Sequence, residues 1–416
     1  MQPVRMFCWH FMAYPNLPKN FDENHESGWV TVPNSLWDNE KSRGLYQEYI
    51  DQLVYADQLG FDGLVLNEHH QNIYGLMPSP NIIASALTQK TKNAKIVVLG
   101  NLPPLFLNPL RVAEEYAMID NMSDGRLIAG FAVGGGPESF NYNVPSPHGR
   151  RRLWEAVDLI VKSWTDDGPF LHEGPCYPMR YVNIWPKPQQ QPPPEVWIPG
   201  SRSIESMAEV AKRGYCYFLS SRSHGGGTRM AAREFAKVME EHGKVYTPFK
   251  MGVLLSVYVS ETDEQARAES EEGVFYFLRN CLKGHLRREG RSMTFGPGVP
   301  SQSLKSWEAF LNAPRGPANL SGGEMLGDAK DWEDLETKNS IMVGSPETVR
   351  KKLWEFVEDA KVGNLLIQFQ FGNMKDELAR KSMKLFAEEV MPVMRKDSAE
   401  LFSNEFPVLQ EMEAAE

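Results

Sequence analysis

Short apolar segments alternate with amphipathic segments along most of the chain. Residues 62–66 are apolar and follow Gly60, which is typical of a strand buried on both faces of a parallel sheet. Residues 45–59 carry apolar side chains at helical spacing, and Gly60 ends that helix. The pattern of apolar and polar residues predicts eight strands, at 4–11, 62–66, 94–99, 127–133, 196–198, 215–219, 251–259 and 364–371. It predicts helices at 45–59, 80–90, 111–119, 150–164, 204–213, 228–242, 264–280 and 349–360. Strands that alternate with helices in this way predict an α/β fold, the (β/α)8 TIM barrel.

Two segments interrupt this alternation. A hairpin is expected at about 170–185, where short extended pieces flank a Gly-Pro pair. The segment at about 281–340 contains a Gly/Pro-rich, charged tract at 290–328, which predicts a lid-like insertion before the last βα unit. Residues 1–395 are therefore interpreted as one barrel domain, and the polar residues 396–416 as a C-terminal tail.

The composition excludes several classes of protein. The formal net charge is −10 without a dense basic run, which argues against nucleic-acid binding. The four cysteines form no CxxC pair, which fits a reduced, cytoplasmic protein. The chain begins without a signal-peptide pattern and has no apolar run of the roughly 20 residues that a membrane span needs, so no membrane association is expected.

The candidate chemistry lies where the predicted strands end. Glu68, His69 and His70 directly follow the second strand, and parallel α/β folds bind their ligands at the carboxyl ends of the strands. Taken alone, the two histidines also fit one packed and one solvated side chain. A metal site is not expected, because adjacent side chains on an extended strand point in opposite directions. HxH and HExxH pairs are absent from the sequence, and so is a GxSxG elbow.

Two glycine-containing segments also follow strands. Residues 200–203 precede a helix, and their backbone N–H groups and hydroxyls fit either a bound anion such as phosphate or an ordinary serine N-cap. Residues 134–136 do not form a GxGxxG fingerprint, so a Rossmann dinucleotide site is not expected. Glycines at this position would let a flat ring approach the backbone.

Several motifs together resemble the bacterial luciferase-like flavin-dependent monooxygenases. They are Leu59-Gly60-Phe61-Asp62, Asn67-Glu68-His69-His70, Asn108-Pro109-Leu110-Arg111 with Glu114-Glu115, and Asp120-Asn121-Met122-Ser123-Asp124-Gly125-Arg126. The resemblance covers residues 6 to about 218 and resumes at 344–372. It implies a (β/α)8 barrel, usually dimeric, that takes reduced FMN from a separate NAD(P)H:flavin reductase. With O2 the flavin would form a C4a-peroxyflavin that oxidises a small apolar or aromatic organic substrate.

The resemblance also assigns residues to roles. His69 matches the family's catalytic histidine, and His70 and Glu68 beside it are also predicted to be catalytic. Gly100-Asn101 matches the position of a non-proline cis peptide bond beneath the flavin. The expected cofactor-binding residues are Gly100, Asn101, Val133, Gly134, Gly200, Ser201, Arg202, Ser203 and Ser206. Val133 stands where the luciferase has a phosphate-binding arginine, so Arg202 or Arg222 is the expected substitute. Aromatic and neighbouring residues predicted to shape the substrate pocket are Trp9, His10, Phe11, Trp37 and Tyr74.

Two alternatives remain open at this point. One is a deazaflavin (F420)-dependent oxidoreductase on the same barrel, which transfers hydride and needs no oxygen. The other is a non-catalytic flavin-binding subunit, against which the presence of His69 at the catalytic position argues. The resemblance implies a homodimer, and the sequence does not identify the substrate or the outcome of the oxidation.

Overall fold

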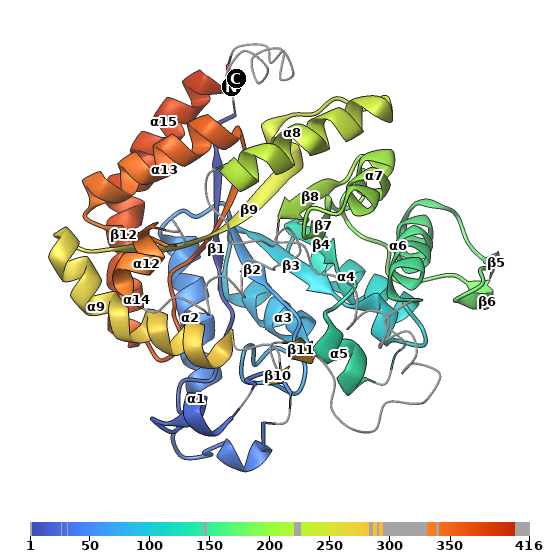
Figure 1. Ribbon diagram of the computed structural model, residues 1–416. Coiled ribbons are helices and arrows are strands. Elements are labelled where there is room, and N and C mark those ends of the chain that lie inside the picture. The colour runs from blue at the N-terminus through green and yellow to red at the C-terminus, as the bar shows by residue number, and fades with distance from the viewer. Residues whose placement is uncertain are drawn as a thin grey trace.

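The protein is a closed barrel of eight parallel strands with helices around it (Figure 1). The computed structural model describes residues 2–25, 27–30, 32–142, 144, 148–219, 226–282, 286–288, 291–293, 331–337 and 341–403. Neighbouring strands follow the order β9, β13, β1, β2, β3, β4, β7 and β8, and pairing of β8 with β9 closes the barrel. The strands are β1 (Arg5–Trp9), β2 (Gly63–Leu66), β3 (Lys95–Asn101), β4 (Leu127–Phe131), β7 (Val196–Gly200), β8 (Cys216–Leu219), β9 (Met251–Val259) and β13 (Asn364–Gln368). The predicted (β/α)8 fold is confirmed.

Alternation along each strand divides the core into two clusters. On β1, Phe7 and Trp9 belong to a cluster inside the barrel, whereas Met6 and Cys8 belong to the cluster between strands and helices. On β2, Val65 lies in the inner cluster and Leu66 in the outer one. This period of two is what an extended backbone imposes on its side chains.

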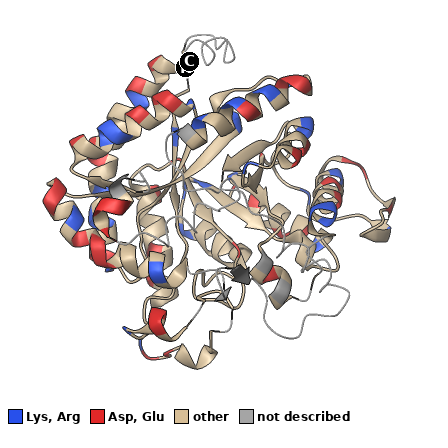
Figure 2. Cartoon of the chain, viewed as in Figure 1, with Lys and Arg blue, Asp and Glu red and all other residues tan. Residues whose placement is uncertain are grey.

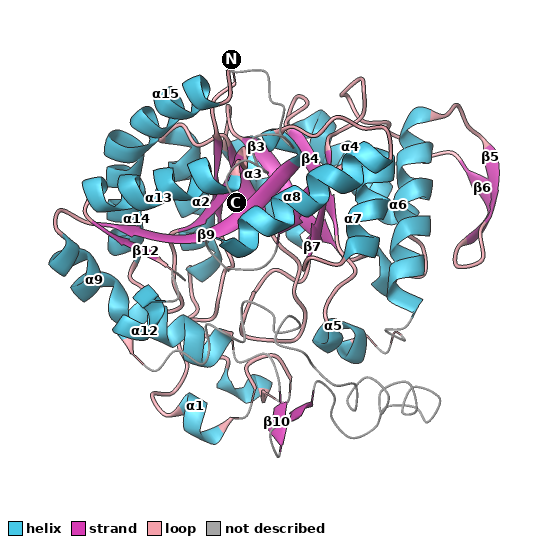
Figure 3. Cartoon of the chain, turned by 45° about the horizontal axis from the view of Figure 1, so that its top comes forward, coloured by secondary structure: helices cyan, strands magenta, loops and turns pink. Residues whose placement is uncertain are grey.

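The helices cover the outside of the barrel (Figure 3). They are α2 (Leu45–Gln58), α3 (Pro80–Lys90), α4 (Leu110–Met122), α6 (Gly149–Thr165), α7 (Ile204–Arg213), α8 (Gly226–Glu241), α9 (Asp263–Tyr276), α13 (Pro346–Ala360), α14 (Asp376–Leu385) and α15 (Met391–Leu401). Ser345 caps α13, since its hydroxyl accepts a hydrogen bond from the Thr348 N–H, and Pro346 occupies the first turn. Acidic and basic side chains are interspersed on these helices, while the strands carry few (Figure 2).

The predicted hairpin is present as β5 (Phe170–Glu173) and β6 (Pro178–Val182), which pair antiparallel and project beyond α6 (Figures 1 and 3). A short strand that the sequence pattern did not predict, β12 (Met342–Gly344), pairs with β9 outside the barrel. Most of the predicted lid lies outside the described residues, including nearly all of the 290–328 tract. Its described parts are the paired strands β10 (Leu286–Arg288) and β11 (Arg291–Met293) and the helix α12 (Trp332–Thr337).

The predicted tail, residues 396–416, begins within a helix. Helix α15 continues through Leu401, with Met394 and Ser398 buried. The Ser398 hydroxyl accepts a hydrogen bond of 3.0 Å from the Val4 N–H, so this helix packs against the start of β1. The residues at 396–401 are largely polar because an outer helix keeps a polar face. Residues 404–416 of the expected tail lie outside the described residues.

Within the described ranges, every helix is too short or too polar to span a bilayer.

Candidate active site

A cavity of about 360 Å³ opens at the carboxyl ends of the strands. It is lined by loops that follow β1, β2, β3, β4 and β7 and by residues of β8 and β9. Ten of the residues predicted for the site line it: Trp9, Phe11, Glu68, His69, Tyr74, Gly100, Val133, Gly134, Gly200 and Ser201. The sequence therefore pointed to this end of the barrel and to half of the residues that line the cavity.

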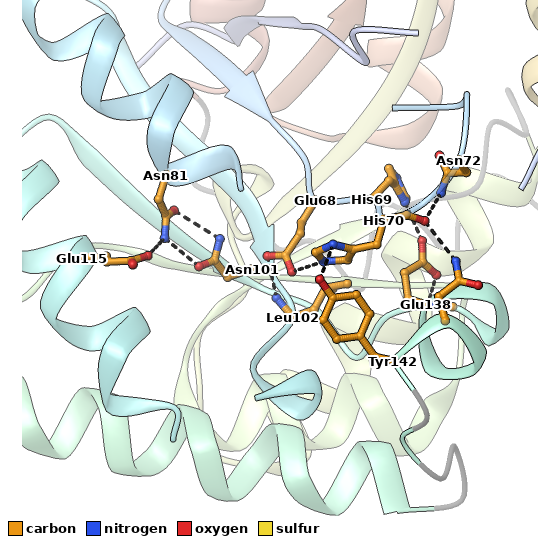
Figure 4. Close-up of polar contacts among 12 residues, drawn as sticks. Glu68, His69, His70, Asn72, Asn81, Asn101, Leu102, Glu115, Glu138 and Tyr142 are labelled. Atoms are coloured by element: carbon orange, nitrogen blue, oxygen red, sulfur yellow. Dashed lines mark hydrogen bonds and ion pairs between the residues drawn. The ribbon is translucent and has the colours of Figure 1, made fainter. Parts of the chain in front are cut away.

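His69 meets a carboxylate that the sequence analysis did not anticipate. Its Nδ1 lies 2.8 Å from Oε1 of Glu138, and the other carboxylate oxygen accepts a hydrogen bond of 3.0 Å from the Gly135 N–H (Figure 4). Burial alone would raise the pKa of Glu138, but the contacts with His69 and the backbone N–H groups hold it below its ordinary value. An ionised Glu138 accepts a hydrogen bond from the protonated Nδ1 of His69. This leaves Nε2 as the ring nitrogen that can interact with a molecule in the cavity.

His70 belongs to a second, buried pair. Its Nε2 lies 2.7 Å from Oε1 of Glu68, and its Nδ1 lies 2.9 Å from the hydroxyl of Tyr142 (Figure 4). Oε2 of Glu68 accepts a hydrogen bond of 3.1 Å from the Leu102 N–H. Burial raises the pKa of Glu68, and the hydrogen bond with His70 offsets only part of that effect. Both ring nitrogens of His70 are thus engaged, and His70 is not part of the cavity wall.

Aromatic rings form much of the remaining wall. Tyr74 contacts His69 edge to face at 4.6 Å between ring centroids and stacks on Trp29 at 4.5 Å. Trp9 stacks on Phe218 at 5.5 Å. Such walls suit a flat apolar or aromatic ligand, and the cavity volume lies within the roughly 300–1,000 Å³ of small-molecule sites.

A non-proline cis peptide bond lies in the wall, between Leu99 and Gly100, one bond before the predicted position. A Cβ at Gly100 would stand 2.6 Å from the backbone of Gly130 and Phe131, so only glycine fits here. Asn101 lies behind the wall, where its side chain exchanges hydrogen bonds with Asn81.

The predicted anion-binding segment is divided between the cavity and the helix start. Gly200 and Ser201 line the cavity, whereas the Ser203 hydroxyl caps α7 by accepting a 3.4 Å hydrogen bond from the Ser206 N–H. The Arg202 N–H donates to the Tyr217 hydroxyl at 2.9 Å, and the Arg202 guanidinium lies 3.9 Å from Glu234. The serine N-cap is thus present, and Arg202, Ser203 and Ser206 do not line the cavity. Arg222, the other expected substitute, lies outside the described residues.

Two residues predicted for the substrate pocket lie elsewhere. His10 points away from the barrel interior, where its Nε2 lies 2.9 Å from Oε1 of Gln52 and its Nδ1 accepts from the Met12 N–H. Burial lowers the pKa of His10 to about 4, so this ring is neutral near pH 7. Trp37 stacks on Tyr14 at 5.3 Å on the surface. Strand alternation explains the error at His10, because Trp9 and Phe11 on either side of it face inward.

The sequence analysis missed three wall residues of chemical interest, Trp29, Asn67 and Glu138. Glu138 had a detectable signal, since it closely follows the glycines at the end of β4. Asn67 could also have been found from the sequence, because it stands two residues after Val65, whose side chain points into the barrel from β2. Trp29 lies in a long loop without such a signal. Over the described residues, no group of three or more His, Cys, Asp or Glu side chains has a geometry that could hold a metal ion.

Comparison with known proteins identifies the family. The family model for luciferase-like monooxygenases matches residues 26–362, and the chain belongs to this family of oxidoreductases. A relative, the oxygenase component of a flavin-dependent trigonelline monooxygenase from Acinetobacter baylyi, is 29% identical over 245 residues, which cover 58% of this chain and 66% of the relative.

Solved structures share the fold. The oxygenating constituent of 3,6-diketocamphane monooxygenase from Pseudomonas putida, a type II Baeyer–Villiger enzyme in complex with FMN, superposes with a TM-score of 0.68 at 20% identity, over 94% of this chain and 98% of its own. An F420-dependent secondary alcohol dehydrogenase in complex with an F420–acetone adduct superposes with a TM-score of 0.63 at 15% identity, over 94% and 99% of the two chains. The same barrel therefore serves both a flavin and a deazaflavin.

Proposed function

We propose that this chain is the oxygenase component of a two-component monooxygenase, which uses reduced FMN and O2 to oxidise a small apolar or aromatic organic substrate. The observation that carries the proposal is the position of His69 in the cavity wall, where Nδ1 contacts buried Glu138 and Nε2 has no hydrogen-bond partner among the described residues. A histidine held in this way is positioned to act as a general acid or base.

The cavity fits a flavin ring on several counts. Its wall has no side chain at Gly100, aromatic rings on two sides, and buried polar groups that lack a partner among the described residues. Reduced FMN would supply the electrons that activate oxygen. Gly200 and Ser201, next to the start of α7, would hold the phosphate, and Arg202 would approach it if its side chain turned from Glu234.

Residues of the cavity wall would then transfer protons and keep water out of the site. Nε2 of His69 would give a proton to, or take one from, the reacting oxygen, while Glu138 stabilises the charged ring. Trp9, Phe11, Trp29 and Tyr74 would exclude water from that position. A separate NAD(P)H:flavin reductase, a cytoplasmic location and a homodimer stay predictions.

The proposal is tested by supplying the full chain with chemically reduced FMN, isotopically labelled O2 and a panel of apolar carbonyl and aromatic compounds. We expect a product that carries one labelled oxygen atom. Tight binding of oxidised F420, together with no oxygen uptake in the presence of reduced FMN, would instead establish the deazaflavin alternative that the dehydrogenase fold suggests.

A further inference from the structure

Two buried polar groups in the cavity wall lack hydrogen-bond partners. Asn67 is 3% exposed, and neither its Oδ1 nor its Nδ2 has a partner among the described residues. Trp9 is 5% exposed, and the same holds for its indole Nε1. Buried amides and indole N–H groups are almost always paired, because leaving them unpaired costs free energy. Both residues line the cavity.

The two groups lie on neighbouring strands and face the same interior. β1 and β2 pair in parallel with Trp9 opposite Val65, and Asn67 stands two residues beyond Val65 on the same inward face. Asn67 differs in this from Asn81, which is equally buried but donates to Asn101 and to Glu115 (Figure 4). Asn81 therefore has its hydrogen-bond partners within the protein, whereas the side chain of Asn67 has none among the described residues.

We propose that Asn67 and Trp9 recognise a planar ring that carries a carbonyl beside a ring N–H, that is, a lactam or imide edge. A side-chain carboxamide offers a donor next to an acceptor, which matches such an edge at two points. The Trp9 N–H adds a second donor for a carbonyl oxygen. The stacked pairs Trp9–Phe218 and Trp29–Tyr74 supply flat apolar surfaces for the body of the ring.

This chemistry has two possible sources, the organic substrate and the pyrimidine edge of the flavin. The presence of a flavin in the cavity rests on the proposed function, whereas the role of Asn67 in recognising a lactam or imide edge does not. Binding is therefore measured by calorimetry on the full chain with two matched pairs of probes. The first pair is 2-quinolinone and its N-methyl derivative, and the second is FMN and 3-methyl-FMN, so that within each pair only the ring N–H is lost.

We expect the N–H form of one pair to bind at least about tenfold more tightly than its methylated form. In N67L this preference should fall below about threefold, while the methylated form binds as before. Loss of the preference in the quinolinone pair assigns Asn67 to the substrate, and loss in the FMN pair assigns it to the cofactor. Equal binding within both pairs, a preference that survives in N67L, or no binding of any probe would overturn the inference.

Two further variants separate recognition from structure. W9F keeps an aromatic ring that can stack on Phe218 and removes the pyrrole part of the indole with its N–H, so it should weaken binding of the preferred probe by several-fold. Without ligand, N67L should melt at or above the temperature of the wild type, because it removes an unpaired amide. N81L is the matched control and should melt lower, because it removes the hydrogen bonds of Asn81 with Asn101 and Glu115. If leucine is not tolerated at position 67, N67A provides the same comparison. A large loss of stability in both N67L and N67A would show that the amide has a partner within the protein.

Discussion

Two adjacent histidines, His69 and His70, each contact one glutamate, yet only His69 lines the cavity. His69 lies at the cavity and keeps one nitrogen for a ligand, whereas His70 has both nitrogens engaged behind the wall. The two glutamates also differ, since the pKa of Glu138 is lowered and that of Glu68 is raised. Residue type therefore says little about role here, and the partners of each ring decide it.

The largest effect is expected for His69→Ala. Removing a general acid or base lowers turnover by about 10²–10⁴-fold, so product formation should be nearly lost. Binding of FMN, followed by quenching of flavin fluorescence, should persist because Glu138 and the aromatic wall remain. Unchanged turnover would remove His69 from the mechanism.

A smaller loss is expected for Glu138→Gln. The amide keeps the size of the side chain but can present its NH2 to Nδ1, which places the ring proton on Nε2 and removes the balancing charge. Loss of such a partner costs about 10–100-fold in activity. The matched control is Glu68→Gln, which alters the other pair. If both variants lose turnover equally at unchanged stability, the contrast between the pairs is wrong.

The two glutamates should also give opposite pH dependences of stability. Glu68 has a raised pKa, so the folded state holds its proton more tightly, and its contribution is fully present below the ordinary value of 4.5 and is lost as pH rises through the folded-state pKa. Glu138 has a lowered pKa, so its contribution is present above 4.5 and is lost as pH falls through the folded-state pKa.

Melting temperatures of the wild type, Glu68→Gln and Glu138→Gln measured across this range test the signs. Relative to the wild type, Glu68→Gln should gain stability as pH rises, and Glu138→Gln should lose it. Parallel curves for the two variants would contradict the assignment of opposite shifts.

The smallest effect is expected for Tyr142→Phe. This change removes the 2.9 Å hydrogen bond to Nδ1 of His70, which should lower the free energy of unfolding by about 0.5–1.5 kcal/mol. Turnover should hardly change, because His70 lies behind the wall. Urea unfolding and a turnover assay on the same preparation measure both, and a large loss of turnover would place the second pair in the reaction.

The sequence alone predicted much of the site because strand ends are local features. The ends of β2, β3, β4 and β7 could be read from apolar runs that stop at glycine or at a polar residue, and parallel strands bring their carboxyl ends to one mouth. Successive side chains on a strand point to opposite faces. This alternation would have excluded His10 from the predicted cavity wall and included Asn67. Trp37 could not be corrected in this way, because it lies in a loop.

The order of eight strands, the hairpin and the residues Glu68 and His69 at the barrel mouth were thus determined by the sequence, through local periodicity and turn residues. Only the tertiary structure decided that His69 meets Glu138, 69 positions away, and that His70 turns to Glu68 and Tyr142. It also decided that Asn81 is satisfied and Asn67 is not. The physical reason is that a hydrogen bond depends on distance and direction between side chains from separate elements, which closure of the barrel sets and no local pattern encodes.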